Sequence, residues 1–174
     1  ARVIGAARFL PLEAFGVYTL AWATTVIATT FVFTGIYHAM LRTTDLRAHG
    51  DTLFGLMAGI GAAGAAVTLS AGLSVGGDVG RALSLVSAVP LLAGPTAWWE
   101  AQLVRAGRTR AASLYVVAAE ALALAAAIVG LTAGFGITAL LVSRYVAAGA
   151  SLVLAGLLVR RLPGLGFRRG GVHE

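Results

Sequence analysis

Five stretches of the chain are apolar for about twenty residues each, the length that a membrane-crossing helix requires. They are approximately residues 15–37, 52–73, 82–99, 112–133 and 137–159, and short charged loops separate them. An α-helix rises about 1.5 Å per residue, so about 20 residues cross the ~30 Å hydrocarbon layer of a bilayer. The pattern predicts an all-α fold, a polytopic integral membrane bundle of five transmembrane helices.

The composition leaves little room for any other domain. Of the 174 residues, 59% are hydrophobic and only 11% are charged. A water-soluble domain of this length needs more polar surface than that. We therefore expect residues 1–174 to form a single membrane domain, with residues 160–174 as a cytoplasmic tail.

The absence of two residue types excludes several kinds of chemistry. All 13 basic residues are arginine, so no lysine is present to form a Schiff base with retinal or a carbonyl substrate. The chain also has no cysteine, which excludes disulfides and thiolate metal sites. The three histidines are not spaced like metal ligands, so we expect neither a metal nor another cofactor.

The distribution of arginine predicts the orientation in the membrane. With five spans, Arg2, Arg8 and Arg81 fall on the N-terminal face and nine arginines fall on the other face. These nine are Arg42, Arg47, Arg105, Arg108, Arg110, Arg160, Arg161, Arg168 and Arg169. Because positive charge is concentrated in cytoplasmic loops, we expect the N-terminus outside and the C-terminus inside an inner or plasma membrane.

The same charge distribution indicates the partners. A net charge of +6 would suggest nucleic acid as the partner of a soluble protein. Here the arginines lie beside one membrane surface, so their expected partners are anionic lipid headgroups, and no nucleic acid is expected.

The third apolar segment contains Pro90 and Pro95, with Gly94 between them. Proline removes a backbone donor and clashes with the preceding turn, so we expect this helix to be kinked or broken. Carbonyls freed inside a membrane must face protein or water, and broken helices often line transport sites. Two interpretations follow: an ordinary kink repaired by Ser87 or Thr96, or part of a substrate site. A re-entrant segment is also compatible with this sequence.

Glu120 and Arg144 are the charged residues expected inside the bundle, on the fourth and fifth spans. Their backbones should differ in depth by only about 8 Å, which two long side chains can bridge. A charge at mid-membrane costs about 2.5–3.5 kcal/mol even on a lenient scale, so it is usually paired or functional. We expect an intramembrane charge pair, serving either hairpin register or the passage of a proton, ion or ligand. A third interpretation is that one side chain snorkels to an interface.

The first span is rich in threonine, and its polar residues fall on two faces at 100° per residue. One face carries Thr19, Thr30, Thr34 and Tyr37, with His38 at its inner edge. The other face carries Tyr18, Thr25 and Thr29. The first stripe is either a polar path or a row of hydroxyls bonded to their own helix.

Small residues recur at helical spacing, most clearly in the second span. This span contains Gly55-x-x-x-Gly59 and Gly61-x-x-x-Ala65. Lipid tails are as apolar as leucine, so membrane helices associate through close packing of such residues. We expect these faces to pack within the chain, between copies of it, or against other membrane subunits.

No motif identifies a particular family, substrate or reaction, and we expect no enzymatic activity. The leading hypothesis is a non-catalytic integral membrane subunit that packs or docks in a larger membrane assembly. The alternative is a small ion, proton or solute transporter or channel that works as an oligomer, with Glu120, Arg144 and the Pro90/Pro95 break lining the path. A third hypothesis is an adaptor whose arginine-rich tail contacts a cytoplasmic partner.

Overall fold

The computed structural model describes residues 11–32, 36–42 and 46–159 of the chain. Residues 1–10, 33–35, 43–45 and 160–174 lie outside this description, and with them Thr34 and the arginine-rich tail. Every regular element in the described ranges is a helix. In chain order they are α2 (Leu12–Val32), α3 (His38–Arg42), α4 (Leu46–Val75), α5 (Gly77–Val86), α6 (Val89–Arg105), α7 (Thr109–Thr132) and α8 (Ile137–Val159).

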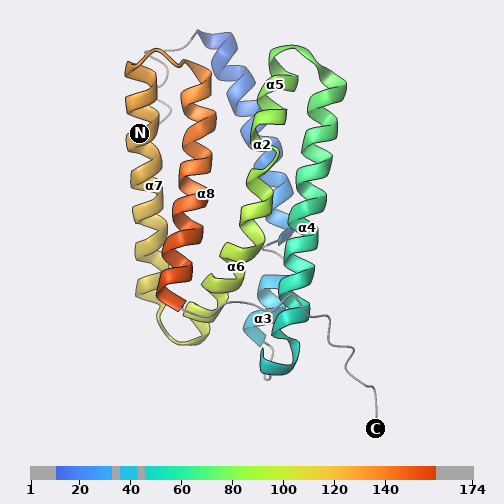
Figure 1. Ribbon diagram of the computed structural model, residues 1–174, viewed down its shortest axis with the longest axis vertical. Helices are drawn as coiled ribbons and strands as arrows, with labels where there is room; N and C mark the ends of the chain where they lie inside the picture. Colours follow the sequence, from blue (N-terminus) through green and yellow to red (C-terminus); the bar gives the residue numbers. More distant parts are fainter. Residues whose placement is uncertain (1–10, 33–35, 43–45, 160–174) are drawn as a thin grey trace.

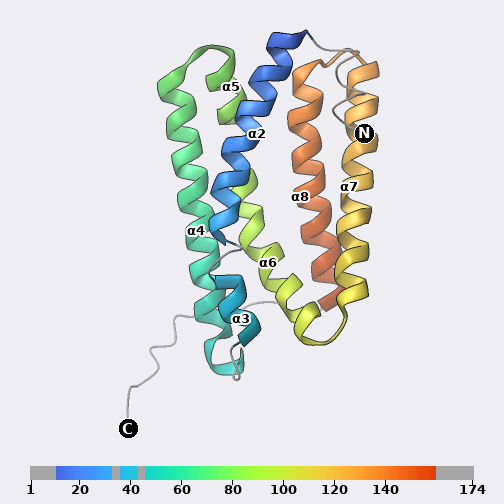
Figure 2. The ribbon, with the colours of Figure 1, turned by 180° about the vertical axis from the view of Figure 1, so that it is seen from behind.

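Five helical segments are long and apolar enough to cross a membrane. They are Leu12–Thr30, His49–Val75, Gly77–Arg105, Thr109–Thr132 and Ile137–Val159. Figure 1 shows them running along a common axis, with α7 and α8 adjacent on one side and α4 on the other. From behind, α2 crosses between α8 and the α4–α5 pair (Figure 2). The predicted all-α membrane bundle of five spans is confirmed.

The third apolar segment is longer than the predicted residues 82–99, and it consists of two helices. α5 begins at the upper end of the bundle in Figure 1 and α6 ends at the lower end, so the segment crosses the bundle. α5 ends at Val86 and α6 begins at Val89. The predicted bounds were too short because the apolar pattern stops at charged residues such as Asp78 and Arg81, whereas the helix continues past them.

The first span also differs from its predicted bounds of 15–37. The described part of α2 ends at Val32, and Tyr37 lies in a separate helical turn at residues 36–37, directly before α3. α3 lies at the lower end of the bundle beside α4 and α6 (Figure 1). Arg105 Nη1 donates a hydrogen bond to the Met40 carbonyl at 2.6 Å, which fastens α3 to the end of α6.

The last two spans form an antiparallel hairpin. The turn between α7 and α8 contains Gly134 at φ 85° and Gly136 at φ 54°, a backbone region that side-chain-bearing residues rarely adopt. Near this turn the two helices are in close contact, since a Cβ on Gly130 would lie 2.6 Å from the Ala139 Cβ.

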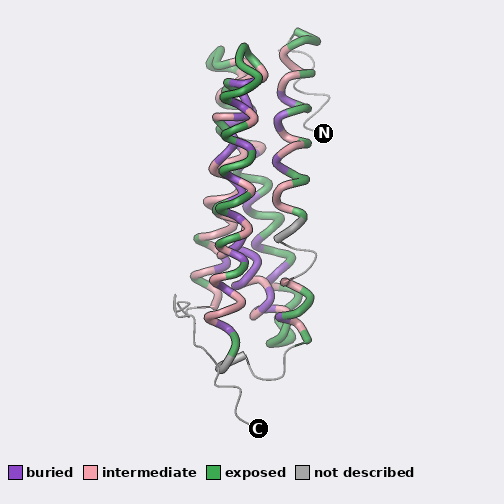
Figure 3. The backbone as a smooth tube through the Cα atoms, turned by 90° about the vertical axis from the view of Figure 1, so that its right-hand side faces the viewer, coloured by how far each residue is buried: buried purple, intermediate pink, exposed green. Residues whose placement is uncertain are grey.

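Burial follows the inward faces of the helices, as the purple segments in Figure 3 show. The outward faces carry large exposed apolar side chains, among them Leu73, Val117, Val129 and Leu157. Exposed side chains of this kind are expected in a membrane, where lipid surrounds them and no water has to be ordered around them.

α4 and α6 are in close backbone contact near the start of α6. A Cβ on Gly61 would lie 2.6 Å from the Pro90 carbonyl oxygen, and one on Gly94 would lie 2.8 Å from the Met57 carbonyl oxygen. Both neighbouring atoms are backbone, so neither can move without shifting a helix. The two glycines therefore fix where α6 begins relative to α4.

We predict that Gly61→Ala destabilises the bundle by about 1–3 kcal/mol, the usual effect of overpacking. Gly59→Ala is the matched control, because a Cβ there meets nothing within 4 Å on the same helix. The midpoint of thermal unfolding in mild detergent, followed by circular dichroism, should fall for the first variant only. Equal midpoints for the two variants would contradict the proposed packing of α4 on α6.

Candidate functional site

A cavity of about 170 Å³, open on one side, lies between α2, α6, α7 and α8. Its polar lining consists of three hydroxyl residues and two charged residues. These are Thr29, Thr96, Ser151, Glu120 and Arg144. Such a set is unusual at membrane depth, where polar groups are costly and tend to mark functional paths.

Arg144 of α8 is held from across the bundle by two aromatic residues of α2. Its Nε donates a hydrogen bond to the Tyr18 hydroxyl oxygen at 2.8 Å, and Nη2 donates to the same oxygen. The guanidinium carbon lies 3.8 Å from the centre of the Trp22 ring, which is cation–π contact distance. Tyr18 and Trp22 are four residues apart and so share one face of α2. The side chain is thereby turned inward toward α2.

Glu120 of α7 lines the same cavity, so the structure brings the two predicted charged residues to one place. The Glu120 side chain is exposed, however, and so lies at the open rim of the cavity rather than inside the bundle as predicted. The hydrogen bonds of the Arg144 guanidinium go to Tyr18, a neutral partner that sequence reasoning did not connect with it. Direct pairing of Glu120 with Arg144 stays a prediction.

The interruption between α5 and α6 borders the cavity. Val89, the first residue of α6, lines it, and so does Thr96 further along the helix. Near the break the Leu85 carbonyl accepts a hydrogen bond from the Tyr145 hydroxyl of α8. Ser87 Oγ donates to the Ser84 carbonyl at 2.7 Å. Side chains thus satisfy backbone groups beside the break, as the hydrocarbon environment requires.

The three residues predicted to mark the break have different places. Pro90 is the second residue of α6, where its missing N–H removes no helical hydrogen bond. Pro95 lies inside α6. Pro90 and Gly94 face α4 through the close contacts described above. Their role in the cavity is therefore positional: they set the path of α6, and their neighbours form the lining.

The predicted threonine stripe lies mostly outside the bundle. Thr19 Oγ1 donates to the Phe15 carbonyl at 2.9 Å and Thr30 Oγ1 to the Val26 carbonyl at 2.8 Å, and both side chains are exposed. His38 is exposed beside the Tyr37 ring, and Thr34 lies outside the described residues. It is the second face, with Tyr18, Thr25 and Thr29, that turns into the bundle.

A family model whose description is "polysaccharide biosynthesis protein" matches residues 6–174, nearly the whole chain. The chain belongs to this family. No curated protein and no solved structure matches it. Together with the five candidate spans, the family indicates a multi-pass membrane protein.

This polysaccharide biosynthesis family protein has a second polar centre that the sequence analysis missed. The Glu100 carboxylate of α6 accepts hydrogen bonds from the Tyr115 hydroxyl of α7 at 2.6 Å and from the Tyr37 hydroxyl at 3.3 Å. Tyr37 lies beyond the first candidate span, and burial raises its pKa to about 12, with a further contribution from the Glu100 charge. The signal in the sequence was a carboxylate directly after Trp98 and Trp99.

Two further donors at this end lack a partner among the described residues. They are Trp98 Nε1 and Gln102 Nε2, both buried on the same face of α6, one turn apart. In the described ranges no three His, Cys, Asp or Glu side chains converge on a point where a metal could bind.

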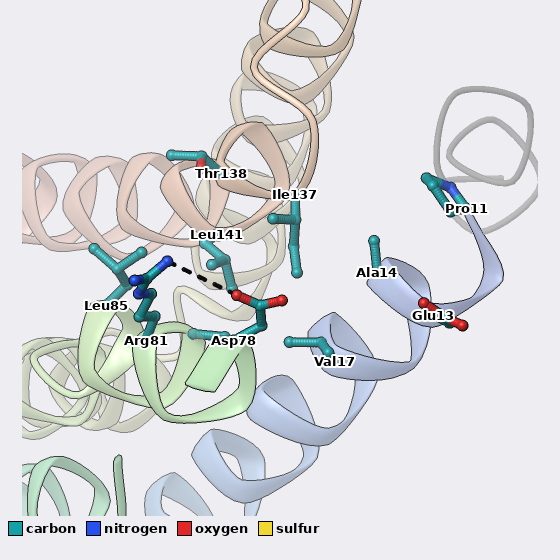
Figure 4. A pocket seen from close by; sticks show the side chains of 11 residues that line it. Pro11, Glu13, Ala14, Val17, Asp78, Arg81, Leu85, Ile137, Thr138 and Leu141 are labelled. Carbon is teal, nitrogen blue, oxygen red and sulfur yellow. Dashed lines mark ion pairs between the residues drawn. The ribbon is translucent and has the colours of Figure 1, made fainter. Parts of the chain in front are cut away.

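At the opposite end of the bundle, α2, α5 and α8 line an open vestibule of about 380 Å³. Figure 4 shows Asp78 and Arg81 of α5 facing the space beside Val17 of α2 and Ile137 of α8. Arg81 Nη1 lies 3.9 Å from Asp78 Oδ1, and both side chains are largely exposed. An exposed pair of this kind contributes little to stability.

We predict that Tyr115→Phe destabilises the protein by about 1.5–3 kcal/mol, the usual worth of a buried hydrogen bond to a charged group. Tyr37→Phe should have a smaller effect, because its bond to Glu100 is longer and Tyr37 is only half-buried. The midpoint of thermal unfolding in detergent measures both. A larger loss for Tyr37→Phe than for Tyr115→Phe would show that this ordering is wrong.

Proposed function

We propose that this protein is a non-catalytic membrane component of polysaccharide biosynthesis that passes a saccharide-bearing, anionic substrate through its bundle. The observation that carries the proposal is the Arg144 guanidinium, which lies in a mainly apolar cavity that Glu120 and three hydroxyl residues also line. Of the three hypotheses drawn from the sequence, this geometry favours the transporter.

The physical reason begins with the substrate. A saccharide carries many hydroxyls, and each one moved into hydrocarbon without a partner costs about 2–7 kcal/mol. A polysaccharide precursor therefore crosses a bilayer only where protein groups replace water around its hydroxyls. The cavity offers the hydroxyl oxygens of Thr29, Thr96 and Ser151 as acceptors, together with a positive charge for an anionic group. Thr29 and Thr96 donate their own protons to carbonyls of their helices.

The neutral partner of Arg144 supports the same proposal. A tyrosine hydroxyl satisfies two guanidinium N–H groups without cancelling the charge. A phosphate or carboxylate accepts the same two donors in a bidentate, charge-assisted arrangement that is about twice as strong as a neutral hydrogen bond. An anionic substrate group can therefore replace Tyr18 at Arg144.

The competing hypothesis is a subunit whose role is packing or docking in a larger membrane assembly. The close contacts of Gly61 and Gly94 are what favour it, since they show how strongly the small residues serve packing within the chain. The two hypotheses differ in one respect: a packing subunit has no flux of its own.

We predict that the protein in liposomes transfers a fluorescent lipid carrying a phosphate-linked disaccharide between leaflets, measured by chemical bleaching of the outer leaflet. Arg144→Gln should lower this rate about 10- to 100-fold, as expected when a charge-assisted hydrogen bond of about 1.5–3 kcal/mol is lost. Arg110→Gln is the matched control, because this arginine is exposed near the start of α7 and lines neither the vestibule nor the cavity.

Three results would decide between the hypotheses. A rate that falls for Arg144→Gln alone, with unchanged helicity and elution volume, supports transport. No transfer above empty liposomes by the parent protein contradicts it. Loss of stability in Arg144→Gln, with no transfer by the parent, favours the packing subunit.

A further inference from the structure

The vestibule and the cavity follow the same face of α8. Ile137 and Leu141 line the vestibule, and Arg144, Ala148 and Ser151 line the cavity. Successive members of this series are three or four residues apart, which places all of them on one side of a helix. The two hollows therefore lie one after the other along a single groove of α8.

The third span shows the same continuity, and α2 also borders both hollows. In the third span, Asp78 and Leu85 line the vestibule, and Val89 and Thr96 line the cavity, with the α5–α6 interruption between the two sets. On α2, Val17 lines the vestibule. Trp22 lines the cavity. All three elements that form the vestibule thus continue into the cavity.

Along α8, Arg144 is the cavity-lining residue nearest to the vestibule, and it contacts α2. Tyr18 directly follows Val17 of the vestibule, and it accepts both hydrogen bonds from the guanidinium. Arg144 lies one turn beyond Leu141 of the vestibule, and its guanidinium covers the Trp22 ring at 3.8 Å. Beside this contact, the Tyr145 hydroxyl is bonded to the Leu85 carbonyl.

We propose that the vestibule and the cavity are two parts of one path, and that the Tyr18–Arg144 contact closes it in this structure. The proposal rests on the proposed function and adds how the site opens. An anionic group arriving from the vestibule competes with the Tyr18 hydroxyl for the Nε and Nη2 donors. A ligand that binds Arg144 better than Tyr18 does shifts the population toward the open state.

The absence of cysteine in the chain makes a direct test available. Thr138→Cys places a thiol in the vestibule and Ser151→Cys places one in the cavity, on the same helix and about 20 Å apart along its axis. Each is treated in intact cells and in inverted vesicles with a charged maleimide that does not cross the membrane. The side from which Thr138→Cys reacts is the side on which the vestibule opens.

From that side, Ser151→Cys should react slowly in the parent background. Adding Tyr18→Phe, which removes the acceptor of the Arg144 hydrogen bonds, should raise the labelling rate about tenfold, corresponding to about 1.4 kcal/mol. Arg144→Met removes the donor of the same hydrogen bonds and should have the same effect. Tyr115→Phe is the matched control, because it removes a comparable hydroxyl–ion hydrogen bond at the far end of the bundle. Elution volume and helicity show which variants fold. If Tyr18→Phe does not fold, the labelling rate of the Arg144→Met variant provides the test.

Each outcome counts for or against the closed contact. Acceleration by Tyr18→Phe or Arg144→Met, without acceleration by Tyr115→Phe, supports it. Fast reaction of Ser151→Cys in the parent, continued protection in both opening variants, or equal acceleration by Tyr115→Phe overturns it. The labelling experiment needs no substrate. If it supports the closed contact but the protein transfers no saccharide, the proposed function is refuted and the closed contact is not.

Discussion

The structure depends most on how a guanidinium is accommodated inside a membrane bundle. An unpartnered charge there is costly, and Arg144 meets this cost with the Tyr18 hydroxyl and the Trp22 ring rather than with solvent. Both partners belong to α2, the helix furthest from α8 in the sequence. The contact therefore ties the first span to the last one and determines which face of α2 turns inward.

The cavity beside Arg144 exists because the third span is interrupted and inclined. Gly61 and Gly94 bring α4 and α6 into backbone contact, and this fixes the start of α6 against α4. Pro90 in the first turn then favours a new helix at that point, and α5 ends four residues earlier. Ser87 and Tyr145 bond to carbonyls beside the interruption. Packing on one side of α6 thus leaves its other side available to line the cavity.

Much of this fold is predictable from the sequence, because the hydrocarbon layer imposes a length and the turns need particular residues. The five spans and the Gly134–Gly136 hairpin are examples. The rotation of α2 is different: both of its faces carry threonine and tyrosine, so the polar pattern favoured the stripe with Thr19 and Thr30, which the structure leaves exposed. The partner of Arg144 could not be predicted either, because Tyr18 lies 126 residues away in the sequence. A partner chosen by opposite charge would be Glu120.

In both polar centres an ionic group is hydrogen-bonded to tyrosine hydroxyls. Arg144 is bonded to Tyr18, and Glu100 is bonded to Tyr37 and Tyr115. Tyrosine hydroxyls satisfy the hydrogen-bonding geometry of an ion without neutralising it, whereas an opposite charge would cancel its field and resist separation at low dielectric. A charge held in this way remains able to attract an opposite charge and to exchange its partner at moderate cost. The proposed function uses this property, because an anionic substrate group can take the place of a neutral hydroxyl at a guanidinium more easily than it can displace a carboxylate.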